Sequence, residues 1–229
     1  MVKIAVCAID TDIGKSVVTG LLARFLKISG TTVTTMKPVQ TGCLGKPEDI
    51  LMHRRIMETD WDQWDEQGLT CPYCLPFPGS PHLAARLADT AIDPQRLDQA
   101  MDELEAHHQW LVVEGAGGLL VPLSDELTWL DYLQERHISV ILVTSPRLGS
   151  INHTLLSLEA IRARGVRLSG LVYNLHGNHP KEIVLDSLRV FRRSLGQYGF
   201  AEKVILLPDT RESLSTNWAP LLADVEGAD

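Results

Sequence analysis

The hydrophobic positions along the chain form two kinds of pattern, one typical of strands and one typical of helices, and the two kinds alternate. Short, almost continuous apolar runs are typical of buried parallel strands, and they occur at residues 4–8, 110–113 and 138–143. The β-branched run at residues 31–35 and the segments at residues 166–173 and 204–207 are also expected to be strands. Apolar residues that recur every three or four positions indicate amphipathic helices, expected over residues 17–28, 47–57, 80–88, 93–107, 127–136, 151–164 and 180–195. Strands that alternate with helices predict an α/β fold with a mostly parallel sheet flanked by helices.

The stretch between residues 45 and 97 has a weaker pattern. Pro47 precedes two acidic residues that suit the first turn of a helix. Trp61 and Trp64 stand among acidic residues, so we expect them in a surface loop. The pair Ser80-Pro81 predicts a further helix, with serine as its cap and proline at its first position.

Length and composition favour one soluble globular domain over residues 1–229. The chain is 45% hydrophobic and 22% charged, and it contains no repeat or low-complexity linker. A net charge of −8 argues against nucleic acid or an anionic membrane as the main partner. No apolar run approaches the roughly 18 residues of a membrane helix, and the N-terminus has no pattern of a signal peptide.

Four cysteines in a chain without export signals are expected to be reduced, in a cytoplasmic protein. Cys71 and Cys74 have the spacing of a redox dithiol, which needs a helix at its second half to lower a thiol pKa. The prolines that follow exclude a helix for several residues. We therefore expect structural loop cysteines.

The first strand leads into the layout of a phosphate-binding loop: strand, polar turn, Gly14-Lys15-Ser16, helix. In such a loop the backbone N–H groups at the helix start face an anion, lysine adds charge, and serine can bind Mg²⁺. The usual pattern has a glycine five residues before Gly14, where this chain has Ile9. An ordinary strand–helix turn with an exposed lysine is the alternative.

Candidate chemistry also follows two other strands. Lys37 and Thr41 come after the second strand, and Glu114 comes after the strand at residues 110–113, before a run of glycines. Ligands of open α/β sheets bind at the carboxyl ends of strands, and an acidic residue with glycines beside it suits Mg²⁺ and phosphate. A solvated strand end for Lys37 and a plain turn after Glu114 are the alternatives.

Several motifs together resemble the dethiobiotin synthetases, in that family's order and over most of the chain. They are Asp10-Thr11-Asp12-Ile13-Gly14-Lys15-Ser16, Lys37-Pro38-Val39-Gln40-Thr41-Gly42, Ser80-Pro81-His82-Leu83-Ala84-Ala85, Glu114-Gly115-Ala116-Gly117-Gly118 with Pro122-Leu123-Ser124-Asp125, and Leu148-Gly149-Ser150-Ile151-Asn152-His153. The resemblance implies a P-loop fold with a seven-stranded sheet, and a homodimer. It also implies formation of dethiobiotin from 7,8-diaminopelargonic acid, CO₂ and ATP, with Mg²⁺.

The resemblance also implies residue roles. Thr11, Lys15 and Lys37 are the expected catalytic residues, and Ser16 (threonine in the family), Asp49 and Glu114 are the expected Mg²⁺ ligands. The expected nucleotide-binding residues are Asp12, Ile13, Gly14, Lys15, Ser16, Glu114, Gly117, Asn174 and Pro208. The expected substrate-binding residues are Thr41, Gly149, Ser150, Ile151 and Asn152.

The chain departs from the family where Ala8-Ile9 replaces the usual Gly-Thr before Asp10. Alanine fits there if its φ is negative and is strained if the position needs a positive φ. Some members also place a tyrosine of a late helix against the partner's substrate, and residues 181–195 contain no tyrosine.

Two other readings share the phosphate loop. An amide-forming ligase of cobalamin synthesis belongs to the same clan, but it usually carries an attached glutaminase domain, for which 229 residues leave no room. A partitioning or positioning ATPase carries an additional lysine at the loop start, where this chain has Ala8-Ile9, and needs a basic or amphipathic surface. The nucleotide base is left open, because one asparagine can accept more than one partner.

Overall fold

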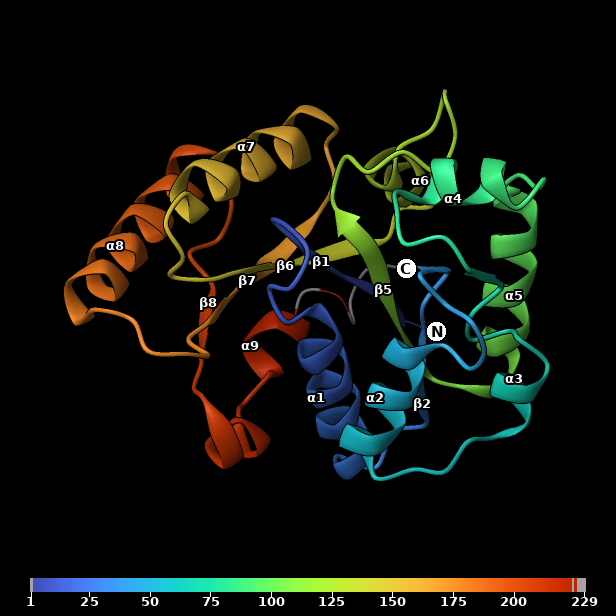
Figure 1. Cartoon of the computed structure of the whole chain (residues 1–229). Coiled ribbons are helices and arrows are strands. Elements are labelled where there is room, and N and C mark those ends of the chain that lie inside the picture. Colours follow the sequence, from blue (N-terminus) through green and yellow to red (C-terminus); the bar gives the residue numbers. More distant parts are fainter. Residues whose placement is uncertain (1, 224, 226–229) are drawn as a thin grey trace.

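The computed structural model describes residues 2–223 and 225 of the chain. Its main sheet has the strand order β2-β5-β1-β6-β7-β8, and every neighbouring pair is parallel (Figure 1). The bounds are β1 Val2–Ala8, β2 Val33–Met36, β5 Trp110–Gly118, β6 Ser139–Thr144, β7 Leu168–Asn174 and β8 Val204–Leu207. The expected α/β fold class is confirmed, although over the described residues this sheet has six strands and not the seven that the resemblance implies.

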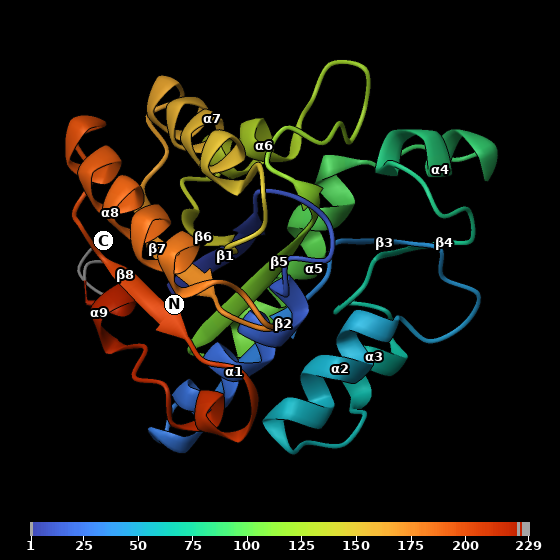
Figure 2. The same ribbon diagram turned by 60° about the vertical axis from the view of Figure 1, so that its left-hand side comes forward.

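Helices cover both faces of the main sheet (Figures 1 and 2). One face packs against α1 (Lys15–Ile28) and α9 (Ala219–Leu222), and α2 (Glu48–Met57) lies against α1. The other face packs against α5 (Pro94–His107), α6 (Trp129–Glu135), α7 (Ser150–Ala163) and α8 (Lys181–Gln197). Both faces are therefore buried, which is why the strands appear in the sequence as continuous apolar runs.

Strand β1 shows how one run of residues serves two cores. Ile4 and Val6 belong to the apolar cluster under α1, whereas Ala5 and Cys7 belong to the cluster under α5 and α6. Successive side chains of a strand point to opposite faces, so both sets must be apolar. The strand is also the point where the order reverses, with β5 on one side and β6 on the other. Ligands of open parallel sheets bind at such a point.

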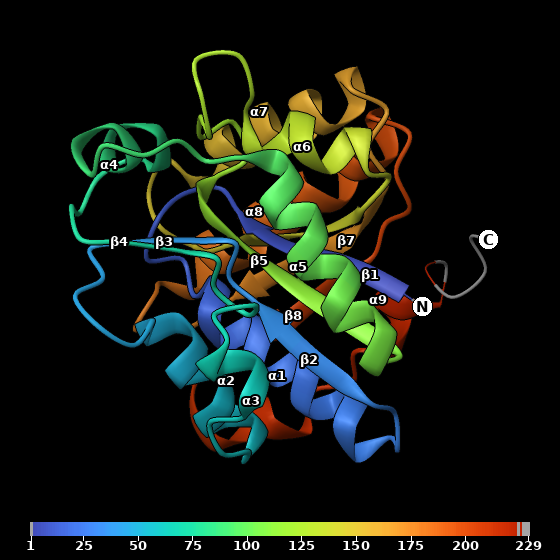
Figure 3. The same ribbon diagram turned by 90° about the vertical axis from the view of Figure 1, so that its right-hand side faces the viewer.

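A separate two-stranded sheet, β3 (Val39–Thr41) with β4 (Tyr73–Leu75), lies beyond the edge of the main sheet near α4 (Pro81–Leu87) (Figure 3). The expectation of four reduced cysteines is wrong here, because Cys43 and Cys74 form a disulfide. Their Cα atoms are 5.5 Å apart, inside the usual range for a disulfide. The pairing of β3 with β4 brings these cysteines together across 31 residues of sequence, which local sequence patterns do not show.

Cys71 is not part of that bridge. It is a free and buried cysteine, and burial raises the pKa of its thiol to about 12. The dithiol-like spacing of Cys71 and Cys74 therefore does not mark a disulfide between these two residues, in agreement with the structural role expected for them.

Three other local predictions differ from the structure. Residues 61–66 are not all loop, because Asp62 caps a short helix, α3 (Gln63–Glu66), and Trp64 packs partly buried against the core. Strand β5 continues to Gly118, so Glu114 lies within the strand rather than at its tip. Ser80 stands at the N-cap of α4, but its side chain makes no capping hydrogen bond.

Over residues 2–223 and 225, no helix is both long and apolar enough to cross a bilayer.

Candidate active site

The turn between β1 and α1 has backbone geometry that only a few residue types tolerate. Gly14 has φ +96°, a backbone conformation that favours glycine. Glycine is also required for space, because a Cβ at this position would lie 2.5 Å from the side-chain nitrogen of Asn174. Asp12 has a positive φ of 54°. Ala8 and Ile9 are not among the described non-glycine residues with positive φ, so Ala8-Ile9 fits this turn without backbone strain.

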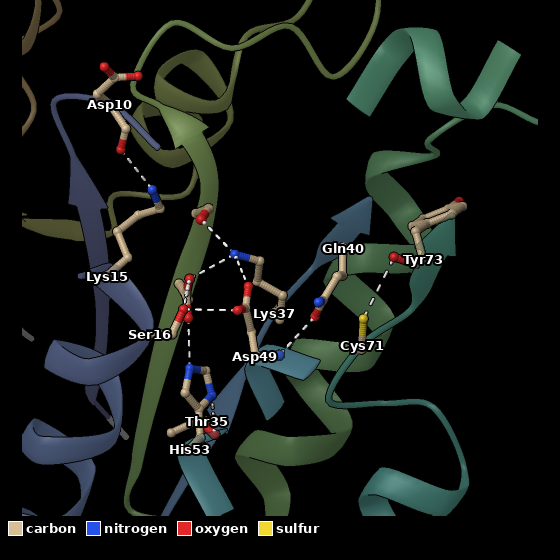
Figure 4. A network of polar contacts seen from close by, with 12 residues as sticks. Asp10, Lys15, Ser16, Thr35, Lys37, Gln40, Asp49, His53, Cys71 and Tyr73 are labelled. Atoms are coloured by element: carbon tan, nitrogen blue, oxygen red, sulfur yellow. Dashed lines mark hydrogen bonds and ion pairs between the residues drawn. The ribbon is translucent and has the colours of Figure 1, made fainter. Parts of the chain in front are cut away.

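Lys15 lies in the first turn of α1 and is largely buried. Its ammonium donates a hydrogen bond of 3.0 Å to the backbone oxygen of Asp10 and so curls over the turn (Figure 4). Burial and the positive charge of Lys37 lower the pKa of Lys15. The lysine is thus held over the loop by one neutral acceptor, which an anionic ligand can replace.

A compact cluster of charges lies beside this turn (Figure 4). Lys37, directly after β2, places its ammonium 2.7 Å from Asp49 Oδ2 and 2.7 Å from Glu114 Oε1. The ammonium also donates to the backbone oxygen of Gly115 at 3.1 Å. The Ser16 hydroxyl lies 2.9 Å from Asp49 Oδ1 and 2.9 Å from Glu114 Oε1. Residues from α1, β2, α2 and β5 therefore meet at one place.

Electrostatics keep these groups charged. Burial alone would lower the pKa of Lys37, but the charges of Glu114 and Asp49 outweigh burial and raise it. Burial alone would raise the pKa of Glu114, but Lys37 and His53 outweigh burial and lower it well below the ordinary range. The cluster is thus a buried ion pair with one further carboxylate.

His53 is a member of the cluster that the sequence did not reveal. It is fully buried, and its Nε2 lies 2.6 Å from Glu114 Oε2. A signal was present in the sequence, because His53 follows Asp49 by four residues on α2 and therefore shares its helix face. A lone histidine on a helix face is too common for that spacing to identify it.

The oxygen groups of Ser16, Asp49 and Glu114 fit a magnesium ion. Mg²⁺ prefers hard oxygen ligands and usually takes only one or two carboxylates from the protein. Here the Ser16 hydroxyl lies 2.9 Å from an oxygen of each of the two carboxylates. Among the described residues, no group of three or more His, Cys, Asp or Glu side chains could hold a metal ion.

These groups line a cleft of about 520 Å³ at the carboxyl ends of the strands. Its walls include ten of the residues expected from the sequence: Thr11, Asp12, Gly14, Lys15, Ser16, Lys37, Thr41, Asp49, Glu114 and Gly117. They also include Val17, Val39, Gln40, Met52 and Ala116, which the sequence did not single out. Gln40 accepts a hydrogen bond of 3.2 Å from the backbone N–H of Asp49 and so ties β3 to the start of α2.

The remaining expected residues lie elsewhere. Asn174, at the end of β7, donates a hydrogen bond of 2.9 Å to the backbone oxygen of Ile13 and so borders the turn. Pro208 follows β8 and lines a separate shallow hollow. Four expected substrate-binding residues lie at the start of α7 and are not among the described residues that line the cleft. They are Gly149, Ser150, Ile151 and Asn152.

Comparison with known proteins places this geometry in context. A sequence-family profile described as an AAA domain matches residues 3–212. An ATP-dependent dethiobiotin synthetase of Chlorobaculum tepidum is 43% identical over 89% of this chain and 85% of its own. One from Pasteurella multocida is 43% identical over 84% and 91%, and one from Haemophilus influenzae is 46% identical over 75% and 90%.

Solved structures of low sequence identity share the fold. The pNOB8 ParA protein, solved bound to nonspecific DNA, superposes with a TM-score of 0.54 at 11% identity, over 93% of this chain and 83% of its own. The MinD cell division protein of Aquifex aeolicus superposes with a TM-score of 0.52 at 12% identity, over 100% and 98%. At these identities the likeness shows the fold alone.

Proposed function

This chain belongs to the family of ATP-dependent dethiobiotin synthetases, and from that premise we propose how its own residues carry out the reaction. It is an ATP-dependent ligase of biotin synthesis. The substrates are 7,8-diaminopelargonic acid, CO₂ and ATP, and the products are dethiobiotin, ADP and phosphate. One amine captures CO₂ as a carbamate, which must then attack the γ-phosphoryl group of ATP.

The observation that carries the proposal is the position of two lysines on one cleft. Carbamate and γ-phosphate are both anions, so their approach is opposed by repulsion. Lys15 and Lys37 both line the cleft, and Lys37 is fixed by two carboxylates. Positive groups that are in place before the reaction stabilise the developing negative charge without reorganisation, which is the main requirement of phosphoryl transfer.

Lys15 and the backbone N–H groups at the start of α1 bind the β- and γ-phosphates. For this, the Lys15 ammonium leaves the Asp10 backbone oxygen and turns to the nucleotide. Thr11, Lys37 and Thr41 hold the carbamate beside the γ-phosphorus. Asn174, with Gly117 and Pro208, contacts the nucleotide farther from the reacting atoms.

The chemical steps need no protein nucleophile. A carbamate oxygen forms a bond to the γ-phosphorus, the bond to the β–γ bridging oxygen breaks, and ADP leaves. The second amine then attacks the carbamate carbon, loses a proton to solvent, and expels phosphate together with the oxygen that came from CO₂. The residues contribute by holding the carbamate oxygen in line with the γ-phosphorus and the bridging oxygen, and the second amine close to the carbamate carbon; proximity of this kind can supply several kcal/mol.

Mg²⁺ fits the group of Ser16, Asp49 and Glu114. When bound, the ion neutralises charge on the β- and γ-phosphates. Lys37 contacts the same two carboxylates, so the residues that would hold the ion also hold the lysine beside it.

The far carboxylate of the substrate is proposed to bind at the start of α7, formed by Gly149, Ser150, Ile151 and Asn152, through backbone N–H groups of the helix start. The Ser150 N–H itself donates to the backbone oxygen of Arg147. We propose that the enzyme acts as a homodimer in the cytoplasm. Leu148, beside this helix start, is fully exposed, and Leu120 in the loop after β5 is half exposed. Large apolar side chains of this kind suit an interface with a second copy.

Isotope transfer tests the order of the steps. The protein is incubated with the diamine, ATP, Mg²⁺ and ¹⁸O-labelled CO₂, and the released phosphate is analysed by mass spectrometry. We expect one ¹⁸O atom per phosphate from fully labelled CO₂, because the bridging oxygen of the anhydride leaves with phosphorus. Phosphate free of ¹⁸O alongside labelled dethiobiotin would contradict attack by the carbamate on ATP.

A further inference from the structure

A fully buried histidine contacts Glu114 from the side opposite Lys37. His53 Nε2 lies 2.6 Å from Glu114 Oε2, while Glu114 Oε1 faces Lys37 and Ser16. Both side chains of the pair are closed to solvent, with exposed fractions of 0% and 1%. The two oxygens of one carboxylate are therefore assigned to different tasks, and the reaction described above uses only Oε1.

The hydrogen bonds behind Glu114, of which Figure 4 shows the one between His53 and Thr35, run in one direction. Arg54 Nη1 lies 3.1 Å from Thr35 Oγ1, and a guanidinium can only donate, so the Thr35 oxygen accepts. The Thr35 hydroxyl can therefore donate its hydrogen to His53 Nδ1, which lies 3.1 Å from Thr35 Oγ1. His53 in turn donates from Nε2, because the ionised Glu114 carboxylate can only accept.

We propose that His53 is a positioning residue, which holds Glu114 so that only its Oε1 is presented to the metal and to Lys37. The proposal rests on the proposed function, because it takes Glu114 as a metal ligand. Without His53, Oε2 is a buried carboxylate oxygen with no described donor, which is costly. The carboxylate would then turn toward Lys37 and Ser16, the donors that remain, and Oε1 would leave its position.

The position of His53 on α2 connects the support of Glu114 to the position of Asp49. The same helix carries Asp49 one turn earlier, so the second proposed ligand and the residue that holds the first lie on one rigid element. Any movement of α2 therefore shifts Asp49 and the support of Glu114 together. Outer partners that orient metal ligands are typically worth about 10- to 100-fold in metal affinity.

The test measures metal affinity directly, apart from turnover. Mn²⁺ serves as the probe, and free Mn²⁺ is followed by electron paramagnetic resonance in the presence of a non-hydrolysable ATP analogue. We expect H53L to raise the Mn²⁺ dissociation constant by about tenfold or more. The affinity for the nucleotide analogue without metal should stay within about twofold of wild type, since Lys15 and the turn are untouched.

A matched pair of variants separates positioning from packing. In H53Q the amide nitrogen can reach the place of Nε2, whereas in H53N it reaches only the place of Nδ1. We therefore expect H53Q to recover most of the Mn²⁺ affinity and H53N to recover little. I56V, a conservative change where the same helix packs against the core, should leave the Mn²⁺ affinity unchanged.

Should H53L not fold, T35V and T35S test the same hydrogen bonds. T35V removes the hydroxyl that orients His53 and is expected to weaken Mn²⁺ binding, while T35S keeps the hydroxyl and should bind normally. Equal Mn²⁺ affinity in wild type, H53L and T35V, or equal recovery by H53Q and H53N, would overturn the proposal. E114Q is measured beside them: if it too leaves Mn²⁺ affinity unchanged, the assignment of Glu114 as a ligand fails instead.

Discussion

Lys37 combines three properties that rarely occur together in one side chain. It is buried, it is held by two carboxylates at 2.7 Å, and it faces the cleft that Lys15 also lines. An ion pair buried this deeply contributes little net stability once desolvation is counted. The arrangement is better explained by function, because it fixes a positive charge where two anionic reactants must meet.

The variant K37A is expected to separate catalysis from binding. Loss of one preorganised charge near the phosphoryl group typically costs about 10² to 10³ in kcat. We expect a fall of that size, while the affinity for ATP stays within a few-fold, since Lys15 and the turn bind the phosphates. Steady-state kinetics and calorimetric titration of ATP measure the two effects. Equal losses in kcat and in ATP affinity would instead identify Lys37 as a nucleotide ligand.

At the scale of elements, a second buried pair fixes α2 in place. Arg54 contacts Asp65 through two hydrogen bonds of 2.7 and 2.8 Å, and Asp65 also accepts a hydrogen bond of 2.6 Å from Thr70. Arg54 also reaches Thr34 and Thr35 on β2. The pair thereby links α2, α3 and β2, and so supports the elements that carry Asp49 and Lys37.

Removal of Asp65 should cost stability and should depend on pH. In D65A the buried Arg54 is left without its partner, which typically costs about 3–5 kcal/mol in free energy of unfolding. Burial alone would raise the pKa of Asp65, but the hydrogen bonds from Arg54 outweigh burial and lower it below the ordinary value of 3.8. The stabilisation is therefore fully present above that ordinary value and is lost as the pH falls through the lower pKa of the folded state.

Urea unfolding of wild type, D65A and D65N between pH 2.5 and 7 measures this dependence. The advantage of wild type over D65N should be constant near neutral pH and should shrink in the acidic range. An advantage that does not change with pH would show that the pair acts through packing and not through charge.

The elements themselves were largely predictable from the sequence, and the reasons are physical. A strand buried on both faces must be largely apolar, so β1, β6 and β7 were visible in the sequence. What the sequence did not reveal depends on distant partners. The disulfide of Cys43 with Cys74 needs the pairing of β3 with β4, and the role of His53 needs β5 to lie beside α2.

The site residues also divide into those that a local sequence motif reveals and those that depend on contacts between distant elements. Motifs with a local backbone signature, such as Gly14-Lys15-Ser16, could be located in the sequence because a turn before a helix start has few solutions. Asp49 was identified only through the family resemblance, because a helix with acidic residues in its first turn is common. The structure brings Asp49 to 2.7 Å from Lys37, a contact that depends on how α2 packs against the sheet.

At the scale of the whole molecule, the net charge of the chain has the same sign as the anions that the proposed reaction brings together. The chain has a net charge of −8, yet the proposed reaction brings several anions into one cleft. Long-range attraction cannot collect these anions, because interactions beyond about 10 Å are screened at ordinary ionic strength. Binding must therefore come from short-range groups, namely the lysines and the helix N-terminus, with Mg²⁺ under the proposed function. Nucleotide binding should accordingly depend on Mg²⁺ much more than on ionic strength.

The exposed apolar residues of the same edge also concern the whole molecule. Leu148 and Leu120 are exposed in the loops that precede α7 and follow β5. The start of α7, proposed to receive the far carboxylate, lies outside the described cleft of the same chain. The proposed homodimer would give both observations one explanation, since a second copy would cover the leucines and complete the substrate site.

The central claim is that this one cleft joins CO₂ and a diamine at the expense of ATP. The most direct measurement is a product assay with purified protein, 7,8-diaminopelargonic acid, bicarbonate and Mg²⁺, with either ATP or CTP, scored for dethiobiotin and phosphate. We predict equal amounts of dethiobiotin and phosphate with ATP, and no phosphate when the diamine is omitted. Phosphate release that does not depend on the diamine, or no dethiobiotin with either nucleotide, would contradict the account.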